Sequence, residues 1–188
     1  MGIFTSFLQR VFRAAVVLAV CAFTSAVIAQ SDLKTVGDYQ LGSGDKIQIS
    51  VYGEEDLTLE TTLSDSGVIN YPFLGELKVV GLTVSSLEAV IVNGLKPDYL
   101  INPNVHVSIL EYRPFFINGE VEKPGGYPFQ PGLTISKAAA LAQGFTERAS
   151  YNKIFIIRGD DASQSREKAE LNTLLRPGDI VTVEQSFF

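Results

Sequence analysis

The sequence contains one histidine and one cysteine among its 188 residues. His106 stands between Val105 and Val107 in an alternating run, which indicates a strand residue pointing away from the valines rather than a catalytic one. Cys21 falls in the apolar N-terminal stretch, and no cysteine follows it. This scarcity excludes zinc sites built from histidine and cysteine, and it excludes cysteine–histidine nucleophiles.

Motifs of phosphate and ester chemistry are also missing. The sequence has no nucleophile elbow and no P-loop, and Gly42-Ser43-Gly44 is too short to cradle a phosphate. Glu54, Glu55 and Asp56 are adjacent, whereas glycoside hydrolysis needs two carboxyl groups across a cleft and calcium loops space their ligands around a glycine. We expect these three residues to form a solvated acidic loop, and we expect no catalytic residue, metal site or cofactor.

Basic residues are outnumbered, with 15 Lys and Arg against 21 Asp and Glu and a formal net charge of −6. Nucleic-acid binding rests on Lys and Arg that neutralise phosphates, so this composition argues against a nucleic-acid partner. Residues 1–29 carry two arginines and no acid, so without them the balance is 13 against 21 and the charge is −8. Such a chain is not expected to hold acidic polymers tightly.

The first 29 residues are typical of a secretory signal peptide. Arg10 and Arg13 precede an apolar run over 14–22, and Val27-Ile28-Ala29 offers short residues for cleavage before Gln30. We therefore expect a signal peptide over 1–29, followed by a polar linker over 30–37.

Two alternatives to a cleaved signal peptide remain open. A permanent membrane anchor over 14–29 would rise about 24 Å as a helix, which is less than the roughly 30 Å hydrocarbon core. A lipoprotein signal ending at Cys21 would normally carry a smaller residue than Val20 before the cysteine. A cysteine that is discarded with the signal peptide is the simpler interpretation.

A first small module is expected over 38–111. Ile47, Ile49 and Val51 alternate in one run, and a second alternating run spans 104–110. Between them the spacing of apolar residues predicts a helix near 84–95. Tyr112-Arg113-Pro114 marks the boundary, because proline cannot donate a hydrogen bond to a sheet.

A second module is expected over 112–188, built as strand, turn, strand and then a helix. Phe115-Phe116-Ile117 forms the first strand, and Lys123-Pro124-Gly125-Gly126 forms a tight corner in which Gly125 takes positive φ. Tyr127 and Phe129 alternate in the next strand. A helix over 135–143 follows, and further strands are expected over 151–157 and 180–183.

Several turn residues are expected to have structural roles. Asp45 and Asp179 each follow a glycine and should accept hydrogen bonds within their own turns, and Glu120 could pair with Lys123. The full set is Gly44, Asp45, Gly119, Glu120, Pro124, Gly125, Pro177, Gly178 and Asp179.

The turn sequences recur along the chain, since Gly44-Asp45 and Gly178-Asp179 both launch an alternating strand, and Gly81-Leu82-Thr83 and Gly132-Leu133-Thr134 both precede a helix. Reuse of the same turn chemistry is the simpler interpretation, and two related folds are the alternative.

Five aromatic residues are candidates for contact with a glycan, because aromatic faces stack on the C–H surfaces of sugars. The alternative is that they line a hydrophobic core. They are Tyr112, Phe115, Phe116, Tyr127 and Phe129.

Two groups of motifs carry a resemblance to a known family. Gly119-Glu120-Val121, the Lys123-Pro124-Gly125 corner, Gly132-Leu133-Thr134 and the turn 176–179 together resemble the soluble ligand-binding β-grasp (SLBB) domain. Upstream, Tyr39 to Ile47 and the stretch 65–76 resemble a polysaccharide-export domain. In this order the two domains resemble the outer-membrane polysaccharide export family of the Wza type.

The resemblance implies an α+β fold and a function without catalysis. It implies a ring-forming component of a capsular or exopolysaccharide export channel, secreted across the inner membrane and held in the periplasm at the outer membrane. The implied partners are the polysaccharide, further copies of the chain and an inner-membrane chain-length regulator or co-polymerase. The alternative is a monomeric periplasmic module that binds a glycan or another ligand without transporting it.

The C-terminus differs from full-length proteins of this type, which carry a further SLBB domain and an amphipathic helix that crosses the outer membrane. This sequence stops at Phe188, shortly after the predicted strand 180–183. We expect it not to cross the outer membrane itself but to dock onto a separate outer-membrane β-barrel, through Phe187 and Phe188.

Overall fold

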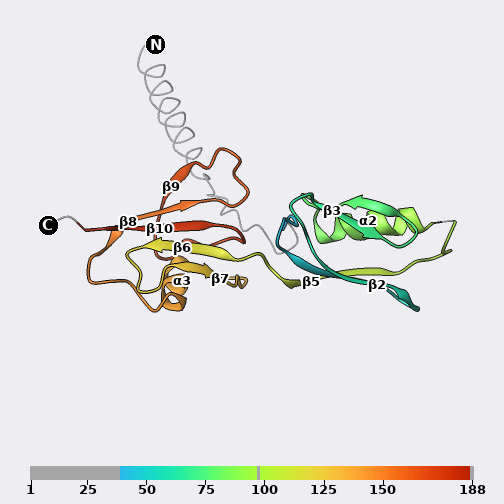
Figure 1. Ribbon diagram of the computed structural model, residues 1–188, viewed down its shortest axis with the longest axis horizontal. Helices are drawn as coiled ribbons and strands as arrows, with labels where there is room; N and C mark the ends of the chain where they lie inside the picture. Colours follow the sequence, from blue (N-terminus) through green and yellow to red (C-terminus); the bar gives the residue numbers. More distant parts are fainter. Residues whose placement is uncertain (1–38, 97, 187–188) are drawn as a thin grey trace, which may run out of the picture. The chain divides into compact units, whose positions relative to one another are not determined.

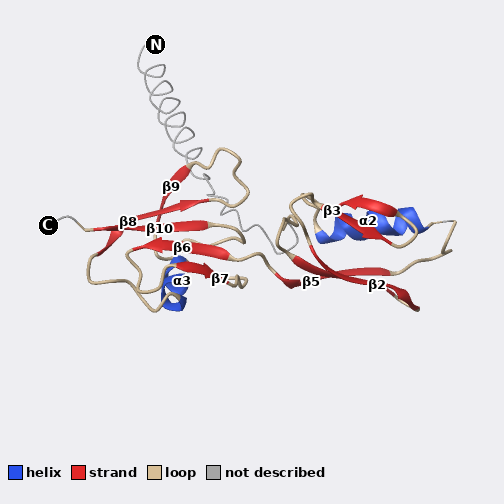
Figure 2. Cartoon of the chain, in the orientation of Figure 1, coloured by secondary structure: helices blue, strands red, loops and turns tan. Residues whose placement is uncertain are grey.

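The computed structural model describes residues 39–96 and 98–186 (Figure 1). The expected signal peptide, the linker, Cys21 and the two terminal phenylalanines lie outside the described residues. The described chain forms helices and sheets (Figure 2), which confirms the expected α+β class. They enclose two separate hydrophobic cores. Among the described residues, no helix is both long enough and apolar enough to span a membrane.

The first module is built on a three-stranded antiparallel sheet with strand order β2-β1-β5. The central strand β1 (Lys46–Val51) pairs with β2 (Glu54–Thr62) on one side and β5 (Val105–Glu111) on the other. Ile47, Ile49 and Val51 point into the core, as their alternation predicts, and both isoleucines are fully buried.

A hairpin and a helix complete this core. The hairpin joins β3 (Val68–Tyr71) to β4 (Gly75–Lys78), and α2 (Val84–Leu95) begins where the Thr83 side chain caps it by accepting a hydrogen bond from the Ser86 N–H. Leu87, Ile91 and Leu95 form the buried stripe of α2. Each buried side chain of this size stabilises the fold by about 1.5–3 kcal/mol.

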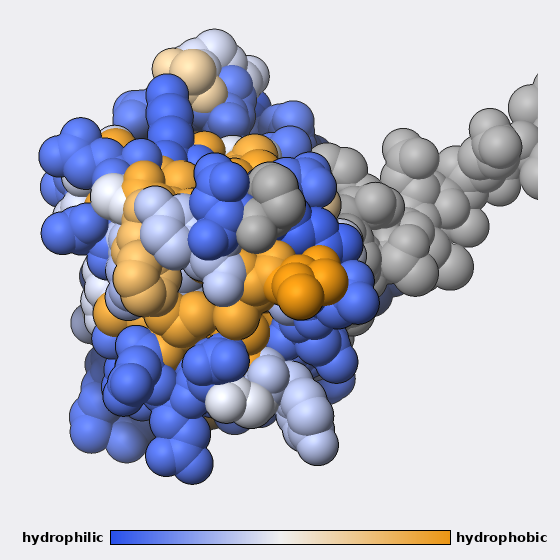
Figure 3. Space-filling model, turned by 90° about the vertical axis from the view of Figure 1, so that its right-hand side faces the viewer, coloured by the Kyte–Doolittle hydropathy of each residue, from blue (hydrophilic) through white to orange (hydrophobic). Residues whose placement is uncertain are grey.

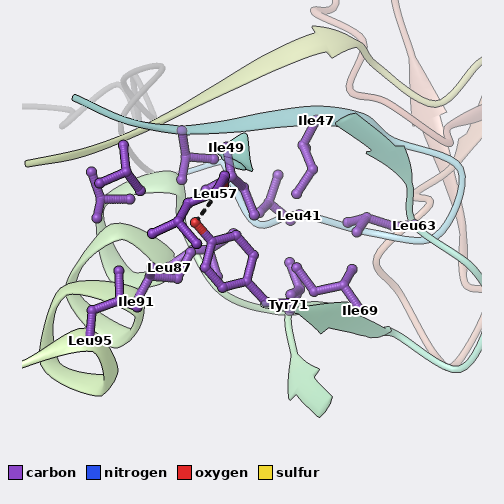
Figure 4. Close-up of a cluster of buried hydrophobic side chains, with 14 residues drawn as sticks. Leu41, Ile47, Ile49, Leu57, Leu63, Ile69, Tyr71, Leu87, Ile91 and Leu95 are labelled. Carbon is purple, nitrogen blue, oxygen red and sulfur yellow. Dashed lines mark hydrogen bonds between the residues drawn. The ribbon is translucent and has the colours of Figure 1, made fainter. Parts of the chain in front are cut away.

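Tyr71 shows how the core accommodates a polar group. Its ring lies among the buried side chains of β1, β2 and α2, and its hydroxyl donates a 2.8 Å hydrogen bond to the carbonyl oxygen of Leu57 (Figure 4). The bond satisfies a hydroxyl that would otherwise be buried without a partner.

The second module contains a five-stranded mixed sheet with strand order β7-β6-β10-β8-β9. Its first strand, β6, runs parallel to its last strand, β10, and the other neighbours are antiparallel. Parallel neighbours need a long crossover, which here contains α3. This is the β-grasp arrangement expected from the sequence. The bounds are β6 (Phe115–Gly119), β7 (Gly125–Tyr127), α3 (Ile135–Leu141), β8 (Ala149–Ile157), β9 (Arg166–Ala169) and β10 (Ile180–Gln185).

The structure corrects the expected corner after β6. Gly125 has no positive φ but begins strand β7, where it pairs with Ile117. Gly119 takes the positive φ instead, at 84°, because the chain leaves β6 there and a Cβ would stand 2.0 Å from the carbonyl oxygen of Val183. Phe129 lies beyond β7 and does not alternate with Tyr127 in one strand.

Two further expectations are wrong, and one strand was not expected. Glu54, Glu55 and Asp56 begin β2 rather than forming a loop, because Glu54 already pairs with Val51 across a tight hairpin. Glu120 does not pair with Lys123, since its carboxylate accepts a 2.6 Å hydrogen bond from the Thr146 hydroxyl. Strand β9 was not expected from its charged sequence, which is typical of an edge strand.

Candidate functional site

The first glycine–aspartate turn holds a buried carboxylate. Gly44 takes φ 91° there, and the next residue, Asp45, is 0% exposed. Its Oδ2 accepts hydrogen bonds from the Gly42 N–H at 2.8 Å and the Tyr39 hydroxyl at 2.6 Å. Its Oδ1 accepts the backbone N–H of Arg113 at 2.8 Å. Four polar groups, counting the Arg113 guanidinium 3.7 Å away, thus converge on this carboxylate.

The second glycine–aspartate turn repeats this arrangement. Gly178 takes φ 85° and Asp179 is also 0% exposed. Asp179 accepts the Arg176 N–H at 2.8 Å, the Gly159 N–H at 3.0 Å and the Arg158 guanidinium at 2.8 Å. Burial raises the pKa of Asp179, although the two backbone N–H groups and Arg158 oppose that rise.

The equivalence of the two turns extends to their neighbours. Each aspartate accepts the N–H of the residue three positions before it. The residue five positions before each aspartate forms a β-bridge with a threonine whose side chain caps a helix, Thr83 for α2 and Thr134 for α3. These bridges are Gln40 to Thr83 and Leu174 to Thr134. The shared set of backbone contacts goes beyond simple reuse of turn chemistry, so it favours two related units. Their order differs, because the turn precedes the helix in the first module and follows it in the second.

Arg113 connects the two turns. Besides its contacts to Asp45, its Nε donates a 3.2 Å hydrogen bond to the carbonyl oxygen of Pro177. The side chain fits because two glycines leave room for it: a Cβ on Gly42 would lie 1.5 Å from its Nη1, and a Cβ on Gly178 would lie 2.8 Å from its Nε. The guanidinium therefore occupies a slot between the turns, which we call the Arg113 joint.

Aromatic rings surround the joint. The Arg113 guanidinium lies 5.7 Å from the centroid of the Tyr39 ring, close enough for a cation–π contact. Tyr112 packs edge-on against Tyr39 at 5.1 Å and against Phe129 at 5.5 Å. Burial and the hydrogen bond to Asp45 raise the pKa of the Tyr39 phenol, so it stays a hydrogen-bond donor at neutral pH.

The five residues predicted to contact a glycan differ in how far their rings are exposed. Phe115 is fully buried in the core of the second module, and Tyr127 stacks on it with a centroid distance of 6.0 Å. Tyr112 and Phe129 are half-buried beside the Arg113 joint. Phe116 is 46% exposed and packs over Gly126, where a Cβ would meet its ring at 2.9 Å. Phe116 thus offers the most accessible of the five rings.

The two buried carboxylates hold their neighbouring groups in position. The carboxylates of Asp45 and Asp179 are buried, and backbone N–H groups and side-chain donors occupy their oxygens. Among the described residues, no group of His, Cys, Asp and Glu side chains has a geometry that could hold a metal ion. His106 lies in β5 and is exposed, with its Nδ1 3.5 Å from Glu88 of α2.

The role of Arg113 was not visible in the sequence. Its partners lie 68 and 64 positions away along the chain, and spacing carries no information over such distances. The one local signal is the repeated Gly-x-Gly-Asp and Pro-Gly-Asp pattern, which predicts two similar turns but not the side chain held between them.

An α+β module followed by a β-grasp module defines the class of protein. Residues 33–110 match the family model described as polysaccharide biosynthesis/export protein, and residues 114–167 match the SLBB domain. The chain belongs to the outer-membrane polysaccharide export family of the Wza type, with the export domain followed by an SLBB domain.

Curated relatives agree with this assignment. The chain is 30% identical over 179 residues to the exopolysaccharide production protein ExoF of Rhizobium meliloti, covering 85% of this chain and 41% of the relative. It is 33% identical over 132 residues to the polysialic acid transport protein KpsD of Escherichia coli, covering 67% and 24%. It is 28% identical over 181 residues to the EPS I polysaccharide export outer membrane protein EpsA of Ralstonia nicotianae, covering 78% and 47%. The chain thus spans less than half the length of each of these relatives.

Proposed function

We propose that this protein is a non-catalytic component of a capsular or exopolysaccharide export channel. It would act in the periplasm, associated with the outer membrane, and assemble as a ring. The observation that carries the proposal is that one chain holds a polysaccharide-export domain followed by an SLBB domain. The names of the three relatives, which describe production, transport and export of polysaccharides, support the same role.

The Arg113 joint supports an assembly role. A closed ring requires every subunit to present its two interfaces at the same angle, because a small error repeated around the ring prevents closure. Arg113 binds Asp45 of the first module and Pro177 of the second through its backbone and its side chain. Such a joint limits the freedom of a two-module subunit.

Weak contacts with the polymer would suit a role without catalysis. A polymer that must move along a passage needs weak and repeated contacts rather than one tight site. The half-exposed ring of Phe116 offers one such contact, and the formal charge of −6 opposes strong binding of acidic chains. The proposed partners are the polysaccharide, further copies of this chain, an inner-membrane chain-length regulator or co-polymerase, and a separate outer-membrane β-barrel.

Deletion of the gene, followed by complementation, tests the export role. We expect cells without the protein to lose polymer from the surface while polymer or its precursors accumulate inside, and we expect the intact gene to restore surface polymer. Surface polymer at the normal level in the deletion strain would contradict the proposal.

The mass of the purified protein tests the assembly role. Analytical ultracentrifugation, with and without detergent, should detect an oligomer that is closed and of one size. A single subunit under every condition, together with measurable binding of a glycan, would instead favour a monomeric ligand-binding module without a transport role.

A further inference from the structure

Four of the exposed large hydrophobic side chains of the first module lie in the connections between its helices and strands. Tyr52 is 87% exposed, Phe73 62%, Tyr99 48% and Ile101 87%. They come from three connections, namely the β1–β2 hairpin, the β3–β4 turn and the segment between α2 and β5. None of them belongs to the set of aromatic residues that the sequence singled out.

Contacts join the three connections that carry these side chains. The rings of Phe73 and Tyr99 stack with a centroid distance of 4.7 Å and an interplanar angle of 29°. The Tyr52 N–H donates a 2.9 Å hydrogen bond to the carbonyl oxygen of Asn104, which ties the hairpin to the segment that carries Ile101. Figure 3 shows hydrophobic residues gathered on this face of the module with hydrophilic residues around them. We call these four residues the aromatic surface.

The backbone of Phe73 is strained. Its φ is 65°, in the left-handed region that bulky side chains avoid, and glycine takes the same conformation two positions later at Gly75 with φ 68°. A glycine or asparagine at position 73 would relieve the strain, yet the chain places a largely exposed aromatic ring there. Strain of this kind concentrates at functional positions, where the side chain matters more than local stability.

Acidic residues lie close in the chain to the residues of the aromatic surface. Glu54, Glu55 and Asp56 follow Tyr52 closely in the chain, and Asp98 directly precedes Tyr99; all four are exposed. The module as a whole, residues 38–111, holds three Lys and no Arg against eleven Asp and Glu, whereas residues 112–188 hold nine of each sign. The negative charge of the protein is therefore concentrated in the module that carries the aromatic surface.

We propose that the aromatic surface binds a partner protein through a segment with apolar side chains flanked by lysine or arginine. Exposed tyrosine and phenylalanine side chains that lie together are typical anchors of protein interfaces. The acidic residues close to it in the chain select a basic partner and speed its approach. The same acidic residues repel anionic lipid headgroups, acidic polysaccharide and the identical surface of a second copy. This inference stands on the first module alone and does not depend on the export role.

A pair of synthetic peptides tests the proposal. Both are 18-residue amphipathic helices with leucine on one face; the other face carries lysine in one peptide and glutamate in the other. We expect the purified protein to bind the lysine peptide with a micromolar Kd by fluorescence anisotropy, and to bind the glutamate peptide at least tenfold more weakly. Equal binding of the two peptides would overturn the choice of a basic partner.

Substitutions separate the aromatic surface from general attraction to an acidic protein. Phe73→Asn and Ile101→Ser should each raise the Kd for the lysine peptide at least fivefold. Neither should lower the melting temperature by more than a few degrees, since Asn tolerates positive φ and Ile101 is exposed. Leu174→Ser is the matched control, because Leu174 is 52% exposed in the second module, and it should leave the Kd unchanged. Unchanged binding by both test variants would overturn the proposal.

Three parallel measurements examine other occupants of the aromatic surface. Sedimentation tests a second copy, phosphatidylglycerol vesicles test a membrane, and a neutral oligosaccharide tests a glycan. An oligomer, vesicle binding or sugar binding that Phe73→Asn abolishes would overturn the assignment to a protein partner. Retention of each of these properties by Phe73→Asn, alongside loss of peptide binding, would support it.

Discussion

The Nε of Arg113 donates a hydrogen bond to the carbonyl oxygen of Pro177, a residue 64 positions later in the chain. The same arginine uses its backbone N–H to bind Asp45, 68 positions earlier. One residue between the modules thus contacts both glycine–aspartate turns, and its fit depends on the missing side chains of Gly42 and Gly178.

The slot around Arg113 can be tested with a double-mutant cycle. Gly42→Ala would place a methyl group 1.5 Å from the position of the Arg113 Nη1, so the guanidinium must leave Asp45. We expect Gly42→Ala to lower the free energy of unfolding by about 1–2 kcal/mol in urea denaturation. In an Arg113→Ala background the same change should cost almost nothing, which gives a coupling energy of about 1 kcal/mol or more. Strictly additive effects would show that the two residues do not interact.

Gly178 should tolerate substitution less well than a glycine with the same backbone but open surroundings. Gly178→Val adds a side chain at φ 85° and 2.8 Å from the Arg113 Nε. Gly132→Val is the matched control, because Gly132 has φ 78° with no atom within 4 Å of its would-be Cβ. We expect the control to cost about 1–3 kcal/mol from backbone strain alone, and Gly178→Val to cost about 1 kcal/mol more. Equal melting temperatures for the two variants would remove the steric role of the joint, and neither variant should change which sugars bind.

Asp179 should give the stability of the protein a distinct dependence on pH. Because burial raises its folded pKa above the ordinary 3.8, the folded state holds this proton to higher pH than the unfolded state does. Its contribution to the free energy of unfolding is therefore largest below about pH 4 and falls as the pH rises through the folded pKa. Asp179→Asn should remove this fall.

Asp161 provides the opposite case within the same module. Hydrogen bonds from Ser163 and Ser165 lower the pKa of Asp161, so its contribution is present above pH 3.8 and is lost as the pH falls through the lowered value. Urea denaturation of Asp179→Asn and Asp161→Asn between pH 3 and pH 7 measures how the free energy of unfolding changes with pH in each variant. If both substitutions change this pH dependence in the same direction, the opposite pKa shifts of Asp179 and Asp161 are contradicted.

The acidic chain should bind acidic polysaccharide weakly. Like charges repel over a Debye length of about 8 Å at physiological salt. Calorimetry with an acidic exopolysaccharide should give a Kd in the millimolar range or no heat, and a neutral polymer of the same length serves as the comparison. A submicromolar Kd would favour a ligand-binding protein rather than a passage for a moving polymer.

The sequence predicts the local parts of this structure well. Alternation predicts β1 and β5, the two Gly-Leu-Thr sequences precede α2 and α3, and the glycine–aspartate pairs predict both turns. These features depend on residues that lie close together in the chain, so a short stretch of sequence is enough to predict them.

The wrong expectations involve contacts between distant residues or charged strands. Gly125 reads as a turn residue from its neighbours, but pairing with Ile117 draws it into β7. The start of β2 and the whole of β9 are rich in charged residues, so their sequences do not indicate strands. Both strands lie at the edge of a sheet, where charged side chains are tolerated. The aromatic surface was missed because Tyr52, Phe73 and Tyr99 lie in three separate connections, which only folding brings together.

The order of strands in the second module has a consequence for how the chain becomes structured. Strand β10 is the last in sequence, yet it lies between β6 and β8 and supplies the hydrogen bonds that unite them. Before β10 arrives, the β6–β7 and β8–β9 hairpins are separate pairs of strands, and such pairs are marginally stable in water. The first module has no such delay, since its central strand β1 comes first. Because Pro177 lies just before β10, we expect the contact between Arg113 and Pro177 to form late in folding, once this strand has entered the sheet.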